Sequence, residues 1–392
     1  MMAVTRLYLL SNKAFLVGCL FIGLLSLKLD ATYTFTSTDG RTLEAEIIEA
    51  SDATVTIRRS SDGRRFTLNI DRLIPKDAVF IQAWLNREQT EAAPLSKAGK
   101  IGRWPRKLKP SNYDITIVRE DSETSTYIYR TPHFEFHSNV KLARKVVREF
   151  SQIFESTLLA VSELPLKLNP EITENTFFLT QIFETEGQYL AAGGIPNSAG
   201  VYFPESRKIM VPLRHLGVKK TSSAYTIDES KEINVLAHEI THQVTHDWLD
   251  KLPIWASEGI AEYIEHVPYE RGAFRFDRFK VDGVLRRGSP SLTSLEVLMN
   301  MSLIEWNQTL AKSPRRAFSN YLSVLVLYYY FCHFDLDKEG NPRLLYDYLR
   351  AIEAGESPEA ATKILLNGRS YEELEEAVVK AFRRGDIKLV FL

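Results

Sequence analysis

The pattern of apolar and polar residues predicts a small β-rich unit near the beginning of the chain. Apolar and polar residues alternate, as in half-buried strands, over 33–36, 43–48 and 54–58. Two Asp-Gly pairs, which begin at Asp39 and Asp62, separate these segments and are typical of tight hairpin turns. A short helix is expected over 75–85. We therefore predict a compact unit over residues 32–87.

The remainder of the chain changes from strands to helices. Strand character is found over 113–118, 125–129, 133–137, 176–180 and 208–213, and a long helix is expected over 140–163. Helical spacing dominates later, over 292–301, 318–334, 344–354, 357–366 and 371–383. Residues 88–110 are rich in Ala, Pro, Ser, Lys and Gly and are expected to form a linker. The pattern therefore predicts an α+β domain over 111–392 that ends in a helical lobe.

An apolar run over 14–27 follows a short segment that contains Arg6 and Lys13. Its length is typical of the core of a signal peptide and is too short to span a bilayer comfortably. Cleavage near Ala31 would remove residues 1–31 and give an exported protein, periplasmic or extracellular. The alternative is an uncleaved membrane anchor. Cleavage would leave only Cys332, so no internal disulfide is expected.

Composition and charge narrow the classes of partner. The chain has 392 residues, of which 44% are hydrophobic and 25% charged, as expected for two or three globular domains. Its net charge of −1 gives no electrostatic reason to expect nucleic acid or an acidic membrane surface as a partner. Contact with a membrane is therefore expected only through an uncleaved N-terminal segment.

The strongest chemical signal is the H-E-x-x-H motif formed by His238, Glu239 and His242. Residues four apart on a helix lie one above the other, so both imidazoles can bind one metal ion. Glu239 lies about 100° around the helix from His238, where a base can deprotonate a zinc-bound water. The surrounding residues are mostly apolar, which predicts burial and disfavours the alternative of a solvent-facing surface helix.

A second motif, W-A-S-E-G-I-A-E-Y over 255–263, contains the leading candidate for a third ligand, Glu258. Two imidazoles and one carboxylate leave the fourth position of Zn²⁺ open, as in catalytic sites. Glu262 lies one helical turn later and is either a carboxylate that holds a ligand histidine or an exposed helix residue. His246 is one turn beyond the histidine pair, too far to reach the same ion, and is expected to support or pack against the site.

These two motifs resemble those of the gluzincin zinc metallopeptidases. From about residue 133 onwards the chain resembles the bacterial peptidase-MA-like proteins of that clan. The resemblance implies a thermolysin-like zincin fold with Zn²⁺ on His238, His242 and Glu258, and with Glu239 as general base and acid. The segment between His242 and Glu258 is slightly shorter than in the best-known gluzincins, which implies a shorter loop between the two helices.

The same resemblance implies two further features of the site. In the aminopeptidase branch of the gluzincins, a tyrosine at about the position of Tyr321 hydrogen-bonds the oxyanion of the tetrahedral intermediate. The alternative is that Tyr321 is an aromatic core residue. An edge strand ahead of the zinc helix binds the substrate backbone in this clan, and residues 193–203 are the candidate for it. The alternative there is an ordinary hairpin that contains glycines.

The first unit resembles the Sla-type homology domain, a small SH3-like barrel found in exported bacterial proteins. The resemblance is carried by T-x-x-D-G-R-T-L-x-A-x-I, which begins at Thr36, and by L-x-x-D-R-L, which begins at Leu68. It implies a separate barrel that binds a protein partner. The alternative is a structural spacer, since the segment contains no cluster of residues suited to chemistry.

We therefore expect a zinc-dependent peptidase that acts on a peptide or protein substrate. One alternative is a catalytically inactive, peptidase-like exported binding protein, and the intact Glu239 argues against it. The other is a protein with a structural zinc site, which would need a fourth protein ligand.

Overall fold

The computed structural model describes residues 33–51, 53–59, 64–78, 80–81, 101–168, 170, 176–222, 224–228, 233–285, 291–383 and 387–392. These residues form two compact units, a smaller one within 33–81 and a larger one within 101–349 and 358–392. Helices and strands are both abundant, which confirms the α+β class. The predicted signal segment 1–31, the first part of the predicted linker, 88–100, and the turn at Asp62 lie outside the described residues.

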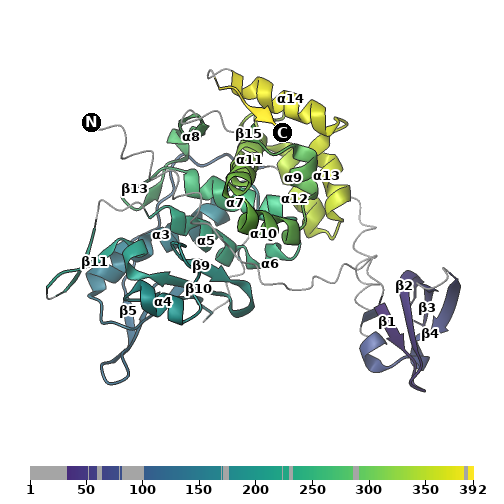
Figure 1. The fold of residues 1–392 in the computed structure, drawn as a ribbon, viewed down its shortest axis with the longest axis horizontal. Helices are drawn as coiled ribbons and strands as arrows, with labels where there is room; N and C mark the ends of the chain where they lie inside the picture. Colours follow the sequence, from purple (N-terminus) through teal and green to yellow (C-terminus); the bar gives the residue numbers. More distant parts are fainter. Residues whose placement is uncertain are drawn as a thin grey trace. The chain divides into compact units, whose positions relative to one another are not determined.

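The small unit contains one antiparallel sheet of four strands in the order β1-β2-β3-β4 (Figure 1). The strands are β1 (Tyr33–Thr36), β2 (Thr42–Ala50), β3 (Thr54–Arg59) and β4 (Arg65–Asn69). The three predicted strands are thus confirmed, and β4 is an addition. Phe35, Val55 and Ile57 are buried at the centre of the unit. Asp77 is also buried and accepts hydrogen bonds from the Tyr33 hydroxyl at 2.8 Å and the Thr36 backbone N–H at 2.5 Å.

The large unit is built on a six-stranded mixed sheet in the order β5-β6-β7-β8-β10-β9. Its strands are β5 (Thr116–Asp121), β6 (Thr126–Arg130), β7 (Phe134–Ser138), β8 (Phe178–Phe183), β9 (Val201–Phe203) and β10 (Lys208–Pro212). The helix α3 (Arg144–Glu163) connects the parallel strands β7 and β8. Phe150 and Phe154 of α3 pack edge-on against Phe136 of β7. Antiparallel pairing of β9 with β10 places β9 at one edge of the sheet.

The rest of the large unit is mainly helical (Figure 1). Its helices are α4 (Glu186–Ala191), α5 (Val235–Val244), α6 (His246–Leu249), α7 (Ile254–His266), α8 (Asp282–Leu285), α9 (Leu295–Asn300), α10 (Leu303–Lys312), α11 (Pro314–His333), α12 (Arg343–Glu353), α13 (Pro358–Leu366) and α14 (Tyr371–Phe382). Short strand pairs are β11 (Val218–Lys220) with β12 (Tyr225–Ile227), β13 (Tyr269–Glu270) with β14 (Ala273–Phe274), and β15 (Ser291–Leu292) with β16 (Val390–Phe391).

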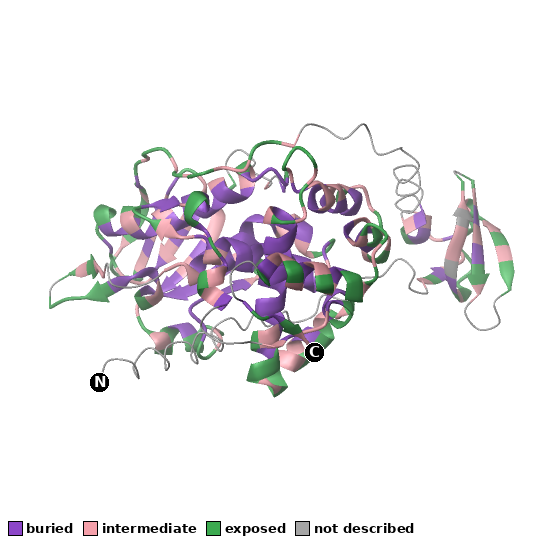
Figure 2. Ribbon diagram, turned by 90° about the horizontal axis from the view of Figure 1, so that it is seen from above, coloured by how far each residue is buried: buried purple, intermediate pink, exposed green. Residues whose placement is uncertain are grey.

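The helices α5, α7 and α11 form the centre of the large unit. The helix α7 packs closely against both α5 and α11. Most residues of these three helices are buried, and Figure 2 shows buried residues at the centre of the unit. The apolar run 324–331 in α11 is buried throughout. Among the residues that the structure describes, no helix combines the length and the apolar character needed to cross a membrane.

Residues 101–110, which the sequence analysis placed in the linker, pack against the large unit instead. The ring of Trp104 lies edge-on to Tyr263, with 5.9 Å between ring centroids, and 5.3 Å from the ring of His333. Leu108 and Phe274 exchange two backbone hydrogen bonds of 3.0 and 2.9 Å. The sequence did not predict this packing, because Trp104 and Leu108 stand four positions apart in a basic segment and do not form a clear apolar periodicity.

Candidate metal centre

The helix α5 is held in place between the sheet and α7. Its apolar residues Leu236, Ile240 and Val244 are buried, as the motif's surroundings predicted. The side-chain amide of Gln243 donates to the carbonyl of Leu179 in β8 at 2.8 Å and to that of Arg207, between β9 and β10, at 3.1 Å. These two bonds tie the end of the motif helix to the sheet. The face that carries the two histidines is therefore fixed toward α7.

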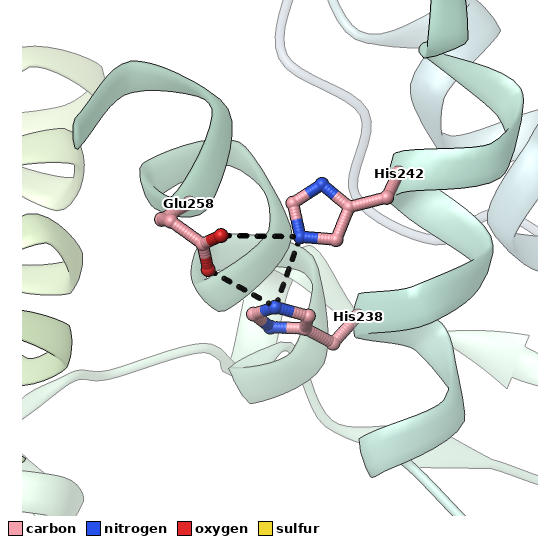
Figure 3. Close-up of side chains that lie close together, drawn as sticks. All are labelled: His238, His242 and Glu258. Atoms are coloured by element: carbon pink, nitrogen blue, oxygen red, sulfur yellow. Dashed lines mark hydrogen bonds and ion pairs between the residues drawn. The ribbon is translucent and has the colours of Figure 1, made fainter. Parts of the chain in front are cut away.

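His238, His242 and Glu258 converge from α5 and α7 on one point (Figure 3). Their facing atoms are separated by 3.1 Å between the two histidine Nε2 atoms, 3.3 Å from His238 Nε2 to Glu258 Oε2, and 3.6 Å from His242 Nε2 to Glu258 Oε1. All three side chains are buried. Ligands about 2.0–2.2 Å from a tetrahedral ion lie about 3.3–3.6 Å apart, so these three residues can hold one metal ion.

The charge state of Glu258 suits this role. Burial by itself would raise the pKa of the Glu258 carboxyl, but the charge of His242 and the close approach of both imidazoles, at 3.3 and 3.6 Å, outweigh burial and hold its pKa at about 2. A buried carboxylate that stays ionised beside two imidazole nitrogens forms a donor set for a divalent cation.

Glu239 follows His238 in α5 and is buried, but it is not one of the three donors. Its Oε2 accepts the backbone N–H of Tyr202 in β9 at 2.8 Å, so the carboxylate is held by the edge strand. The hydroxyl of the same tyrosine lies 2.8 Å from Nδ1 of His246. His246 therefore supports β9 and does not join the metal donors. Sequence reasoning missed the contact between Tyr202 and Glu239, because a backbone bond across 37 residues leaves no local pattern.

Two carboxylates lie behind His238. Its Nδ1 is 3.4 Å from Glu262 Oε1 and 3.4 Å from Glu265 Oε2. Glu262 is only 6% exposed, which excludes the alternative of an exposed helix residue. Glu265 was missed, although the positions 258, 262 and 265 have the spacing of one helix face.

Tyr321 lies beside the histidine pair. It projects from α11, is 7% exposed, and its ring centroid is 6.3 Å from that of His238 and 5.1 Å from that of Trp306. The structure therefore brings Tyr321 to the site, where it also packs as an aromatic residue. His133 and His137 are not part of this group, and each lies beside a glutamate, Glu155 and Glu135 respectively.

The candidate edge strand lies next to α5. Within the described residues, β9 pairs with β10 on one side and contacts α5. Gly193, with φ of +99°, adopts a backbone conformation that favours glycine in the loop before it. Tyr189 anchors this loop, since its hydroxyl accepts the N–H of Ile195 at 3.0 Å and hydrogen-bonds Ser198. Of the expected segment 193–203, only Val201–Phe203 forms a strand, and residues 193–200 form the loop before it. This strand lies at the edge of the sheet and contacts Glu239 through Tyr202.

No protein-family model matches this chain, and no curated protein matches it.

Proposed function

We propose that this protein is a zinc-dependent peptidase of the gluzincin type, with a thermolysin-like zincin fold in its large unit. The observation that carries the proposal is the separation of roles among buried residues. His238, His242 and Glu258 converge on one point, whereas Glu239 is turned toward the neighbouring edge strand. A group of three donors with an adjacent carboxylate is the arrangement that metal-assisted hydrolysis needs.

Zinc is the ion that suits the donors best, because two imidazoles and one carboxylate match its preference for nitrogen and oxygen ligands. The group contains three donors within the described part of the chain. A structural zinc site would need a fourth protein ligand, so the donor set favours a catalytic centre. When bound, Zn²⁺ would lower the pKa of a water molecule and polarise the scissile carbonyl group.

The protein's own residues divide the remaining work. Glu239 removes a proton from the attacking water and passes it to the leaving amine. The backbone N–H of Tyr202 fixes the orientation of Glu239 during this exchange. The hydroxyl of Tyr321 donates a hydrogen bond to the oxyanion that forms on the substrate. Glu262 holds the imidazole of His238 from its Nδ1 side.

The substrate class follows from the strand next to the site. Within the described residues β9 pairs only with β10, so an extended peptide that lies along the other edge of β9 would bring its backbone past Glu239, whose carboxylate accepts the backbone N–H of Tyr202. A catalytically inactive binding protein is the alternative function. It would have no use for a buried carboxylate positioned beside the metal donors, since that group is costly to bury and does not ligate the ion.

The remaining parts of the proposal concern location and the small unit. We infer export from the apolar run at 14–27, with cleavage near residue 31 or retention as an anchor. The four-stranded small unit is proposed to be an SH3-like barrel that binds a protein partner.

The test is cleavage of a mixed peptide pool by the purified, zinc-loaded protein, analysed by mass spectrometry. Glu239→Gln should retain zinc and lose about 10²–10⁴-fold in rate, because it removes the general base without changing a ligand. Glu205→Gln is the matched control, since it makes the same change at an exposed residue near β9. Equal activity of wild type and Glu239→Gln would refute the mechanism. A folded, zinc-loaded wild type without products would favour the binding-protein alternative.

A further inference from the structure

The imidazole of His238 is contacted on both of its nitrogens by carboxylates from α7. Glu258 faces Nε2 at 3.3 Å, and Glu262 and Glu265 both face Nδ1 at 3.4 Å. The three glutamates are four and three residues apart, so successive turns of one helix face supply them. Carboxylates of α7 thus lie at both nitrogens of the His238 ring, and they contribute more negative charge than one hydrogen bond at Nδ1 would require.

Glu265 places a second carboxylate at Nδ1 of His238, in addition to that of Glu262. A neutral imidazole has one N–H, so one carboxylate is enough to orient the ring and fix its tautomer. Glu262 is buried and Glu265 is partly buried, and two carboxylates this close together repel each other more strongly than in water. His266, whose Nδ1 is 3.6 Å from Glu262 Oε2, offsets part of this charge only when protonated. A divalent cation on the opposite nitrogen of the same ring would offset it in every state.

We propose that Glu265 is a positioning residue that acts together with Glu262 on the Nδ1 side of His238 and strengthens metal binding at His238, His242 and Glu258. This role of Glu265 rests on one part of the proposed function, namely that a metal ion binds to His238, His242 and Glu258. Glu265 orients the ring jointly with Glu262, and its negative charge makes His238 a stronger donor. The mechanism of peptide hydrolysis does not enter this argument.

The experiment measures the zinc affinity of the full-length protein by competition with a chelator of known affinity. Glu265→Gln keeps the size of the side chain and removes its charge, and we expect zinc binding to weaken about 10-fold to 100-fold. Glu265→Asp, which keeps the charge, should lie closer to wild type. Glu270→Gln is the control, because it removes one negative charge from an exposed position in the hairpin that follows α7.

A second measurement separates positioning from a merely structural role. A structural contribution of Glu265 would lower the thermal midpoints of the metal-free and zinc-loaded proteins equally. Positioning reduces the difference between the two midpoints, because the loss is in metal binding. Zinc affinity of Glu265→Gln equal to that of wild type and Glu270→Gln would overturn the proposal.

The zinc-to-protein ratio provides a further test. One equivalent in wild type and in Glu265→Gln supports the proposal. A second equivalent that disappears in Glu265→Gln would overturn it, since the two carboxylates would then ligate a second ion. Failure of the peptidase proposal is distinguishable, because it would leave zinc affinity and its dependence on Glu265 intact.

Discussion

Acid should destabilise the large unit through His333. This residue ends α11, and its Nε2 lies 2.9 Å from the hydroxyl of Tyr263. Its ring packs against Trp104 and Tyr329, at centroid distances of 5.3 and 4.4 Å. Burial among these rings disfavours the charged imidazolium and lowers the pKa of His333 from 6.5 to about 4. The Tyr263 hydroxyl donates to Nε2 only while that nitrogen is unprotonated.

The sign and size of the effect follow from linkage. The pKa is lower in the folded protein, so the unfolded chain takes up a proton first as the pH falls. Stability is full above about pH 6.5 and is lost progressively as the pH falls toward 4. At 1.36 kcal/mol per pKa unit, the complete shift corresponds to about 3 kcal/mol, of which about 2 kcal/mol is lost by pH 5.

The assay compares urea unfolding of wild type and His333→Gln at pH 7.5 and pH 5.0, both metal-free so that loss of zinc does not contribute. Tryptophan fluorescence reports on the large unit through residues 104, 248, 255 and 306. Glutamine stays neutral and can still accept from Tyr263. Between the two pH values, wild type should lose about 2 kcal/mol more than the variant. Equal losses would show that His333 keeps its ordinary pKa in the folded protein and would refute the reasoning.

Four further predictions concern the site and its surroundings. Chelation should lower the thermal midpoint of wild type, and zinc at about 100 times its Kd should restore about 2.7 kcal/mol. Glu258→Ala should show almost no zinc-dependent shift in the same melting assay, and a full shift would place the third ligand elsewhere. Tyr321→Phe removes only the hydroxyl, so steady-state kinetics should show kcat reduced about 10²-fold with little change in KM. An unchanged kcat would leave Tyr321 as a packing residue. Gly194→Ala should lower the free energy of unfolding by about 1–3 kcal/mol, because overpacking strains a filled core. A Cβ at residue 194 would lie 2.4 Å from Cζ of the buried Tyr189. An unchanged urea midpoint would show that the ring can move aside.

The sequence predicted those parts of the site that depend on local periodicity. The four-residue spacing of His238 and His242 fixes both rings on one helix face wherever that helix packs, and the structure places their Nε2 atoms 3.1 Å apart. Glu258 could be named because it lies in a recognisable second motif. The position of Glu239 beside the donors followed from the same helical geometry.

Contacts between distant segments could not be predicted in this way. In the sequence, Glu265 is one of several glutamates in α7, and its contact with His238 is seen only when α7 packs against α5. The hydrogen bond from Tyr202 to Glu239 depends on the pairing of β9 with β10, which the sequence does not specify. The helix α10 was missed because Trp306 is its only buried residue within the described chain, so its apolar face is narrow.

The packing of Trp104 and the bridge from Leu108 to Phe274 determine where an independently folding catalytic fragment can begin. A fragment that starts at residue 111, the boundary suggested by the sequence, would uncover the ring of Tyr263 and leave two backbone groups of Phe274 without their protein partners. Residues 101–110 are thus part of the large unit. Recombination or insertion between the two units would preserve the contacts of Trp104 and Leu108 only if it occurred before residue 101. Limited proteolysis of the folded protein should accordingly release a resistant fragment that retains residues 101–110.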